Sequence, residues 1–220
     1  MSERDTGMTQ DAPVAPLSAT VLRVVWMSIV LGLSIEGLLL AVAAGYGVLG
    51  SLKPFAADLA QKISWSVIVC AGIAIGTVVA KARSVAMGLL GLFAAPSGFY
   101  LARALHKGAS QALDLPDVAV MVVPSVLVLA LIKATEYGVL GAAVGWFGSR
   151  RQGGLWTHLG IGLAVGAVFG GLTIYLVIAG AAQPPTAAVL AARVVNEIVF
   201  PVGCALVLYA AQFMGRRLGG

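Results

Sequence analysis

The chain has 220 residues, of which 60% are hydrophobic and 10% are charged, and its mean hydropathy is +0.98. Soluble domains carry about 25% charged residues and disordered chains have low hydrophobicity, so both classes are excluded. The composition predicts an all-α polytopic protein of the lipid bilayer, with room for six or seven membrane helices of roughly 20 residues. The 14 basic residues form no basic run despite a formal net charge of +5, which argues against nucleic acid as a partner.

In chain order, residues 1–18 come first and carry four charged residues and two prolines, which predicts a disordered cytoplasmic tail. The tail lacks the basic region and the cleavage site of a signal peptide, so the first apolar segment is expected to remain in the membrane. Each apolar segment that follows is long enough to cross a hydrocarbon core of about 30 Å. We expect six membrane helices, at residues 20–49, 63–80, 84–102, 118–148, 155–180 and 187–214.

The distribution of lysine and arginine sets the expected orientation. Six crossings place the N-terminus, the loops after the second and fourth segments, and the C-terminus on one side of the membrane. Eight basic residues lie on that side and four on the other. This bias predicts a protein of the bacterial cytoplasmic (inner) membrane with both termini in the cytoplasm. Trp65, near the expected start of the second segment, is expected at a membrane interface.

The two halves of the chain, residues 19–110 and 111–220, resemble each other. The matching positions occur in the same order and are Glu36 with Glu136, Gly72 with Gly162, Gly76 with Gly166, Pro96 with Pro201, and Gly98 with Gly203. The glutamate match weighs most, because the chain has only four glutamates. The alternative is chance matching in a sequence rich in alanine, glycine, valine and leucine. A duplication of three spans predicts a 3+3 inverted repeat, the architecture of many transporters.

Ionisable residues inside the apolar segments form the candidate site. They are Glu36, Lys133, Glu136, Arg193 and Glu197, with Asn196 beside the last. Each charge near the membrane centre costs about 2.5–3.5 kcal/mol, so it must be paired, hydrated or neutral. Lys133 and Glu136 are spaced i,i+3, and Arg193 and Glu197 are spaced i,i+4, so both pairs can form within one helix. Glu36 has no local partner.

These charges have two interpretations. In the functional one, Glu36 and Glu136 build a midplane site with Glu197 and Asn196 nearby, while Lys133 and Arg193 set the charge balance. That site predicts a small transporter or channel for a cation or a proton-coupled solute, a cation because carboxylates outnumber basic groups three to two in the spans. In the structural one, buried ion pairs fix the helix register. That reading predicts a non-catalytic subunit or scaffold that anchors or assembles a larger membrane complex.

Pro96 and Pro201 lie inside the third and sixth segments, each followed two residues later by a glycine, Gly98 or Gly203. A proline inside a helix frees a carbonyl one turn back and kinks the helix. These four residues are therefore candidates for a gating kink, as in discontinuous transporter helices. The other reading is that they form packed kinks without a role in gating.

Other chemistry finds little support in the sequence. Cys70 and Cys204 form no Cys-x-x-Cys pair and no cluster with histidine at metal-ligand spacing, so neither a metal site nor a cofactor is expected. No nucleotide-binding Walker A motif occurs, and no enzymatic activity is expected. Glycines at four-residue spacing, as at Gly162, Gly166 and Gly170, predict close helix packing, within the chain or at a homodimer face.

Overall fold

The computed structural model describes residues 17–78, 82–115, 125–150 and 153–218, and every regular element in these ranges is helical. The predicted tail lies outside the described residues except for Leu17 and Ser18, which begin the first helix. Six helices within these ranges are long and apolar enough to cross a membrane. The all-α prediction and the number of apolar spans are thereby confirmed, whereas the inverted repeat stays a prediction.

The first four spans are uninterrupted helices, and the last two each contain a π-helical turn. The first four are α1 (Leu17–Gly45), α2 (Leu52–Ile75, followed by the 3-10 turn η1, Gly76–Val78), α3 (Arg83–Ala112) and α4 (Val126–Gly148). The fifth span consists of α5 (Leu155–Val165), η2 (Gly166–Gly170) and α6 (Gly171–Gly180). The sixth consists of α7 (Ala187–Val194), η3 (Val195–Val199) and α8 (Phe200–Leu218).

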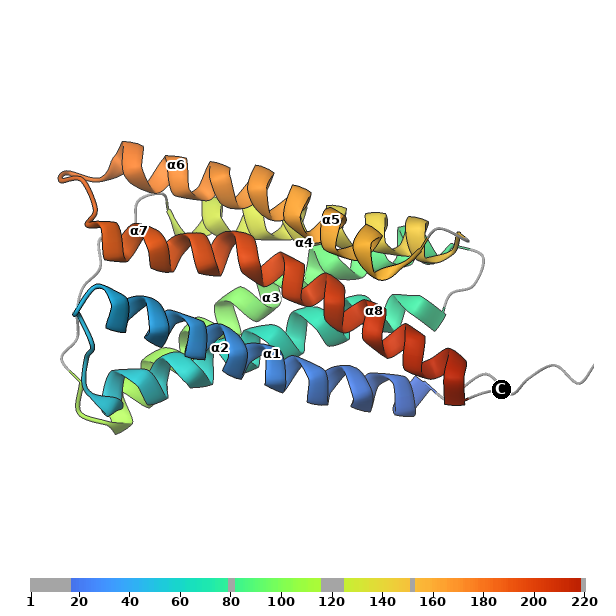
Figure 1. The fold of residues 1–220 in the computed structure, drawn as a ribbon, viewed down its shortest axis with the longest axis horizontal. Coiled ribbons are helices and arrows are strands. Elements are labelled where there is room, and N and C mark those ends of the chain that lie inside the picture. The colour runs from blue at the N-terminus through green and yellow to red at the C-terminus, as the bar shows by residue number, and fades with distance from the viewer. Residues whose placement is uncertain (1–16, 79–81, 116–124, 151–152, 219–220) are drawn as a thin grey trace, which may run out of the picture.

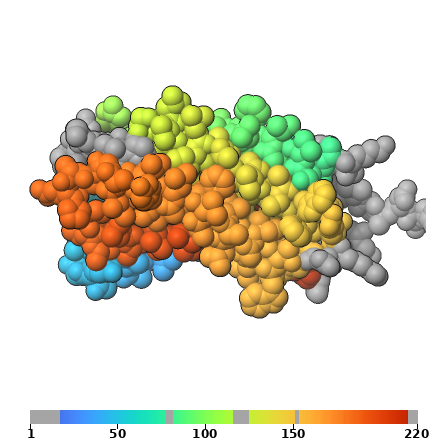
Figure 2. Space-filling view, turned by 90° about the horizontal axis from the view of Figure 1, so that it is seen from above, coloured from blue at the N-terminus to red at the C-terminus, as the bar shows by residue number. Residues whose placement is uncertain are grey.

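The spans run up and down in an elongated bundle, so the start of α1 and the end of α8 lie at the same end (Figure 1). Figure 2 shows α5 and α6 covering one face of that bundle. Much of the apolar core gathers in the half of the bundle that holds these two chain ends. Fully buried side chains there include Val24, Val69, Ile73, Met87, Val144 and Leu208.

The second and third spans extend further than the sequence indicated. Helix α2 begins at Leu52 and not at residue 63, and α3 continues to Ala112 and not to residue 102. Pro54 lies in the first turn of α2, where a helix needs no backbone N–H donor, so the Lys53-Pro54 pair starts the helix and does not end it. The two extensions are joined where the His106 Nε2 atom lies 3.1 Å from Asp58 Oδ1. As a result Lys62 lies inside helix α2 and not at its edge.

The two prolines behave differently. Helix α3 remains α-helical on both sides of Pro96, whereas Pro201 is the second residue of α8, directly after the π-helical turn η3. Pro201 lacks the N–H that would bond to the carbonyl of residue 197, one turn back, so the regular α-helical pattern is already broken at this point. Both following glycines serve packing, because Gly98 faces α2 at Ile68 and Gly203 faces Leu31 of α1.

The glycines of the fifth span pack against the backbone of the sixth. A methyl group added at Gly162, Gly166 or Gly170 would come within 3.0 Å of backbone atoms in residues 197–202. Gly76 likewise lies against the backbone of Met87 at the start of α3. These close approaches occur within one chain, so helix packing inside the protein accounts for the spacing of these glycines.

We expect the two cysteines to form a disulfide on oxidation. Cys70 of α2 and Cys204 of α8 are fully buried, and their Sγ atoms are 3.1 Å apart. Copper(II)-phenanthroline, which enters membranes, would take up two electrons while the two thiols release two protons and form one S–S bond. Mass spectrometry of the digested protein should show one peptide that links both cysteines, and none in a Cys204→Ala control. Cross-linked dimers in place of the intrachain link would contradict this packing of α2 on α8.

Candidate functional site

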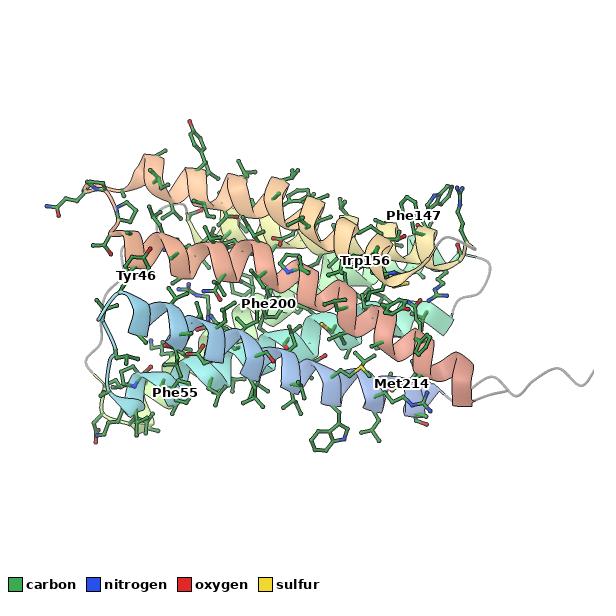
Figure 3. The ribbon with its side chains drawn as sticks, viewed as in Figure 1. Tyr46, Phe55, Phe147, Trp156, Phe200 and Met214 are labelled. Atoms are coloured by element: carbon green, nitrogen blue, oxygen red, sulfur yellow. The ribbon has the colours of Figure 1, made fainter. Side chains whose placement is uncertain are left out.

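A cavity of about 180 Å³ lies between the second, third, fourth and sixth spans. Of the residues that line it, Lys62, Lys133 and Glu197 lie seven to ten residues after the starts of α2, α4 and α7. At a rise of about 1.5 Å per residue, they are about 10–15 Å from the end of the bundle where α1 joins α2. Figure 3 shows Phe200, another lining residue, near the middle of the bundle. The cavity therefore lies among the helices that are long and apolar enough to span a membrane, in the half of the bundle opposite the chain ends.

The cavity has a charged part and an aromatic part. The polar lining residues are Gln61 and Lys62 of α2, Lys133 of α4, Arg193 of α7, and Asn196 and Glu197 of η3. The aromatic lining residues are Trp65, Phe99, Tyr137 and Phe200. Because the lining combines an apolar wall with a few convergent polar groups, it has the composition of a small-molecule site.

A triad of charged side chains joins α4 to the sixth span. The Lys133 Nζ atom lies 2.6 Å from Glu136 Oε2 and 2.6 Å from Glu197 Oε2. The i,i+3 pair expected from the sequence therefore forms. Glu136 is fully buried, and its second oxygen, Oε1, has no hydrogen-bond partner among the described residues. With both carboxylates ionised the triad carries one net negative charge, and one added proton makes it neutral.

The expected pair of Arg193 with Glu197 is wrong. Glu197 instead binds Lys133, and Arg193 forms no ion pair with any residue that the structure describes. The buried Nε atom of Arg193 has no hydrogen-bond partner there either. The reason is the π-helical turn η3, which contains Glu197. Its i→i+5 bonds widen the turn, so residues spaced i,i+4 no longer lie above one another.

Lys62 is the charged lining residue that the sequence analysis did not include in the candidate site, and the aromatic lining residues and Gln61 were not included either. Its side chain lines the cavity and interacts electrostatically with Glu36, Asp58 and Glu197. The spacing of Asp58 and Lys62, i,i+4, was a local signal that the helix starts earlier. With Lys62 included, the described lining of the cavity carries three basic groups, Lys62, Lys133 and Arg193, and one carboxylate, Glu197, so the excess of carboxylates that favoured a cation does not hold for the lining.

Glu36 and Glu136, the two glutamates of the apparent repeat, do not line the cavity. Glu36 is 4% exposed, and its Oε2 atom has no hydrogen-bond partner in the part of the chain that the structure describes. It lies on α1 within electrostatic range of Lys62. The two glutamates are thus connected through intervening charges, Lys62, Glu197 and Lys133, and not through a direct contact.

Trp65 lies at the centre of the aromatic wall and contacts its other three members. Its ring centre lies 5.5 Å from that of Tyr137, 6.4 Å from Phe99 and 6.2 Å from Phe200, all in edge-on arrangements. Helix α2 begins earlier than predicted, so Trp65 lies near the middle of its helix and not near its start, where the interfacial interpretation placed it. Beside this wall, Asn196 donates from Nδ2 to the carbonyl of Ala192 at 3.2 Å.

Comparisons of the chain with protein-family models, with curated proteins and with solved structures give no match in any of the three. The site is therefore interpreted from its own geometry. Its distinguishing features are a cavity inside apolar helices, one neutralisable ion triad and one guanidinium group without an ion-pair partner among the described residues.

Proposed function

We propose that the protein is a small secondary transporter that moves a solute together with a proton. The observation that carries this proposal is the cavity, which is lined by charged side chains and lies between helices that are long and apolar enough to span a membrane. Such charges are costly in a bilayer, and where they face a cavity they commonly mark a substrate, ion or proton pathway. The sequence left two substrates open, a cation or a solute carried together with a proton. The three basic residues on the lining favour the solute, because they would repel a cation.

The triad of Lys133, Glu136 and Glu197 is the proposed proton site. It holds two carboxylates for one ammonium group, with both Nζ to Oε2 distances at 2.6 Å. A proton taken up by either carboxylate removes the net charge of the triad, and its release restores it. Because Glu197 also lines the cavity, a proton on the triad and a solute in the cavity interact directly.

The sixth span is the proposed moving element. Its π-helical turn η3 packs against the π-helical turn η2 of the fifth span. Such turns interrupt the α-helical bonding and are frequent at functional sites, as are broken helices in transporters. The apolar core closes the half of the bundle that holds the chain ends, while the cavity lies in the other half. With both termini in the cytoplasm, as the basic residues predict, the cavity lies in the outer half of the membrane.

The alternative is a membrane subunit without transport activity, which anchors or assembles a larger complex. The observation that favours it is that Lys133 binds two carboxylates at once and so fixes α4 against the sixth span. The two functions differ in water access. A transporter opens its site to each side of the membrane in turn, whereas an anchoring subunit has no need to do so.

Cysteine labelling tests this difference. We expect Asn196→Cys, in a chain whose native cysteines are replaced by alanine, to react with a membrane-impermeant thiol reagent from either side of the membrane. Residue 196 lines the cavity, so alternating access exposes it to both aqueous phases. The measurement is the labelled fraction in membrane vesicles of each orientation.

Two control variants calibrate the labelling. Leu131→Cys, on the exposed apolar surface of α4, should stay unreactive because lipid covers it, and Gln183→Cys, between α6 and α7, should react from one side only. Reaction of Asn196→Cys from one side alone, or from neither, would overturn the transport proposal and favour the subunit.

A further inference from the structure

We infer that the solute is a small organic monocarboxylate with an apolar body about the size of a benzene ring, bound by Arg193 and moved with one proton. This inference rests on the proposed function and adds the substrate class. Three observations support it: the volume of the cavity, the distribution of charge on its lining, and the charge balance of the surrounding groups.

The volume limits the size of the solute. The cavity measures about 180 Å³. An apolar protein cavity of about 150 Å³ is large enough to hold benzene. The cavity therefore accepts one six-membered ring, or an aliphatic chain of similar volume, together with a carboxylate group. Trp65, Phe99, Tyr137 and Phe200 provide the apolar surface for that body.

The charge on the lining selects an anion. Glu197 is the one carboxylate among the described lining residues, and Lys133 already binds it. Arg193 lines the same cavity without an ion-pair partner among the described residues, and its guanidinium group can donate two parallel hydrogen bonds to a carboxylate. Lys62 adds a second positive charge on the lining. A cationic solute would meet repulsion from both groups.

The charge balance couples the anion to a proton. Around the cavity, Glu36, Glu136 and Glu197 offset Lys62, Lys133 and Arg193 when all six groups are ionised. Further charged groups at this end of the bundle are Asp58, which contacts His106 and lies within electrostatic range of Lys62, and the exposed residues Lys53, Arg103, Lys107 and Asp114, none of which lines the cavity. A bound monocarboxylate adds one negative charge, and one proton on Glu136 or Glu197 cancels it. The O–H bond formed on the glutamate breaks again on release, the bonds of the solute are unchanged, and the proton and the anion leave together.

Binding of radiolabelled benzoate to the purified full-length protein tests the substrate class. We expect saturable binding that is tighter at pH 6 than at pH 8, because the proton accompanies the anion. Benzamide, a neutral analogue of the same shape, should compete about tenfold more weakly or worse, since a charged hydrogen-bonded pair is lost. Equal competition by benzamide, or stronger competition by benzylamine or by inorganic phosphate, would overturn the assignment.

Variants test the role of Arg193. Arg193→Gln should weaken benzoate binding about tenfold or more, and Arg193→Lys should fall between it and the unmodified protein, because lysine keeps the charge but loses the planar fork. Lys107→Gln, an exposed position on α3 outside the lining, removes the same charge and should bind normally. Unchanged affinity in Arg193→Gln overturns the assignment. Should that variant fail to fold, Lys62→Gln and the competition series on the unmodified protein still decide the question.

The labelling and binding experiments together distinguish an error in the substrate class from an error in the transport proposal. Benzoate should protect Asn196→Cys from the thiol reagent, because both occupy the same cavity. If residue 196 reacts from both sides but benzoate neither binds nor protects, the substrate class is wrong and the transport proposal stands. If benzoate binds and protects, but residue 196 reacts from one side only, the anion site stands and the transport proposal fails.

Discussion

Replacing Lys133 with methionine is expected to destabilise the protein by about 3–5 kcal/mol, the range for breaking a buried ion pair by removing one partner. The ammonium group of Lys133 is the shared hydrogen-bond partner of Glu136 and Glu197, at 2.6 Å from each. Without it, the buried carboxylate of Glu136 and the part-buried carboxylate of Glu197 lose their shared ion-pair partner. Unfolding by sodium dodecyl sulfate in mixed detergent micelles, followed by circular dichroism, would give the change in free energy.

Two further variants show whether this loss comes from the unpaired charges. Lys107→Met removes an exposed lysine of α3 and should change the free energy of unfolding by less than about 0.5 kcal/mol. Adding Glu136→Gln and Glu197→Gln to Lys133→Met removes the charges that lost their partner and should restore much of the stability. A single variant as stable as the unmodified protein, or a triple variant as unstable as the single one, would show that the triad does not hold α4 to the sixth span.

Gly170→Ala is expected to destabilise the protein by about 1–3 kcal/mol, whereas Gly171→Ala should be neutral or stabilise it by up to about 1 kcal/mol. A methyl group at Gly170 would overlap the backbone and Cβ atoms of Glu197, whereas at Gly171 it would meet no atom within 4 Å. The two residues are neighbours in the same span, so they lie at nearly the same depth and differ in what they face: Gly170 is buried against the sixth span, and Gly171 is partly exposed.

The same two variants report on function, because Gly170 supports the backbone that carries Glu197. Thermal unfolding in detergent gives the stability of each variant, and benzoate binding gives the state of the cavity. Gly170→Ala should lower both, and Gly171→Ala should lower neither. If the two alanine variants are equally stable and bind equally, the close packing of η2 on η3 is wrong.

The sequence by itself determined the features that depend on neighbouring residues. The apolar segments predicted six membrane helices because length and hydropathy are local properties, and the described part of the chain has six helices that are long and apolar enough to span a membrane. The i,i+3 spacing of Lys133 and Glu136 predicted their contact, because α4 is a regular helix. Lys133, Arg193, Asn196 and Glu197 were also recognised as site residues from their positions in apolar segments, and all four line the cavity.

Only the tertiary structure decided which charges meet across helices. The π-helical turn at Val195–Val199 directs Glu197 to Lys133 and leaves Arg193 without an ion-pair partner among the described residues. Lys62 enters the site because α2 begins within a polar stretch that hydropathy alone assigns to a loop. Cys70 and Cys204 are 134 positions apart in sequence, yet their sulfur atoms are 3.1 Å apart. These contacts depend on how helices distant in sequence pack, and no residue spacing along one chain segment encodes that packing.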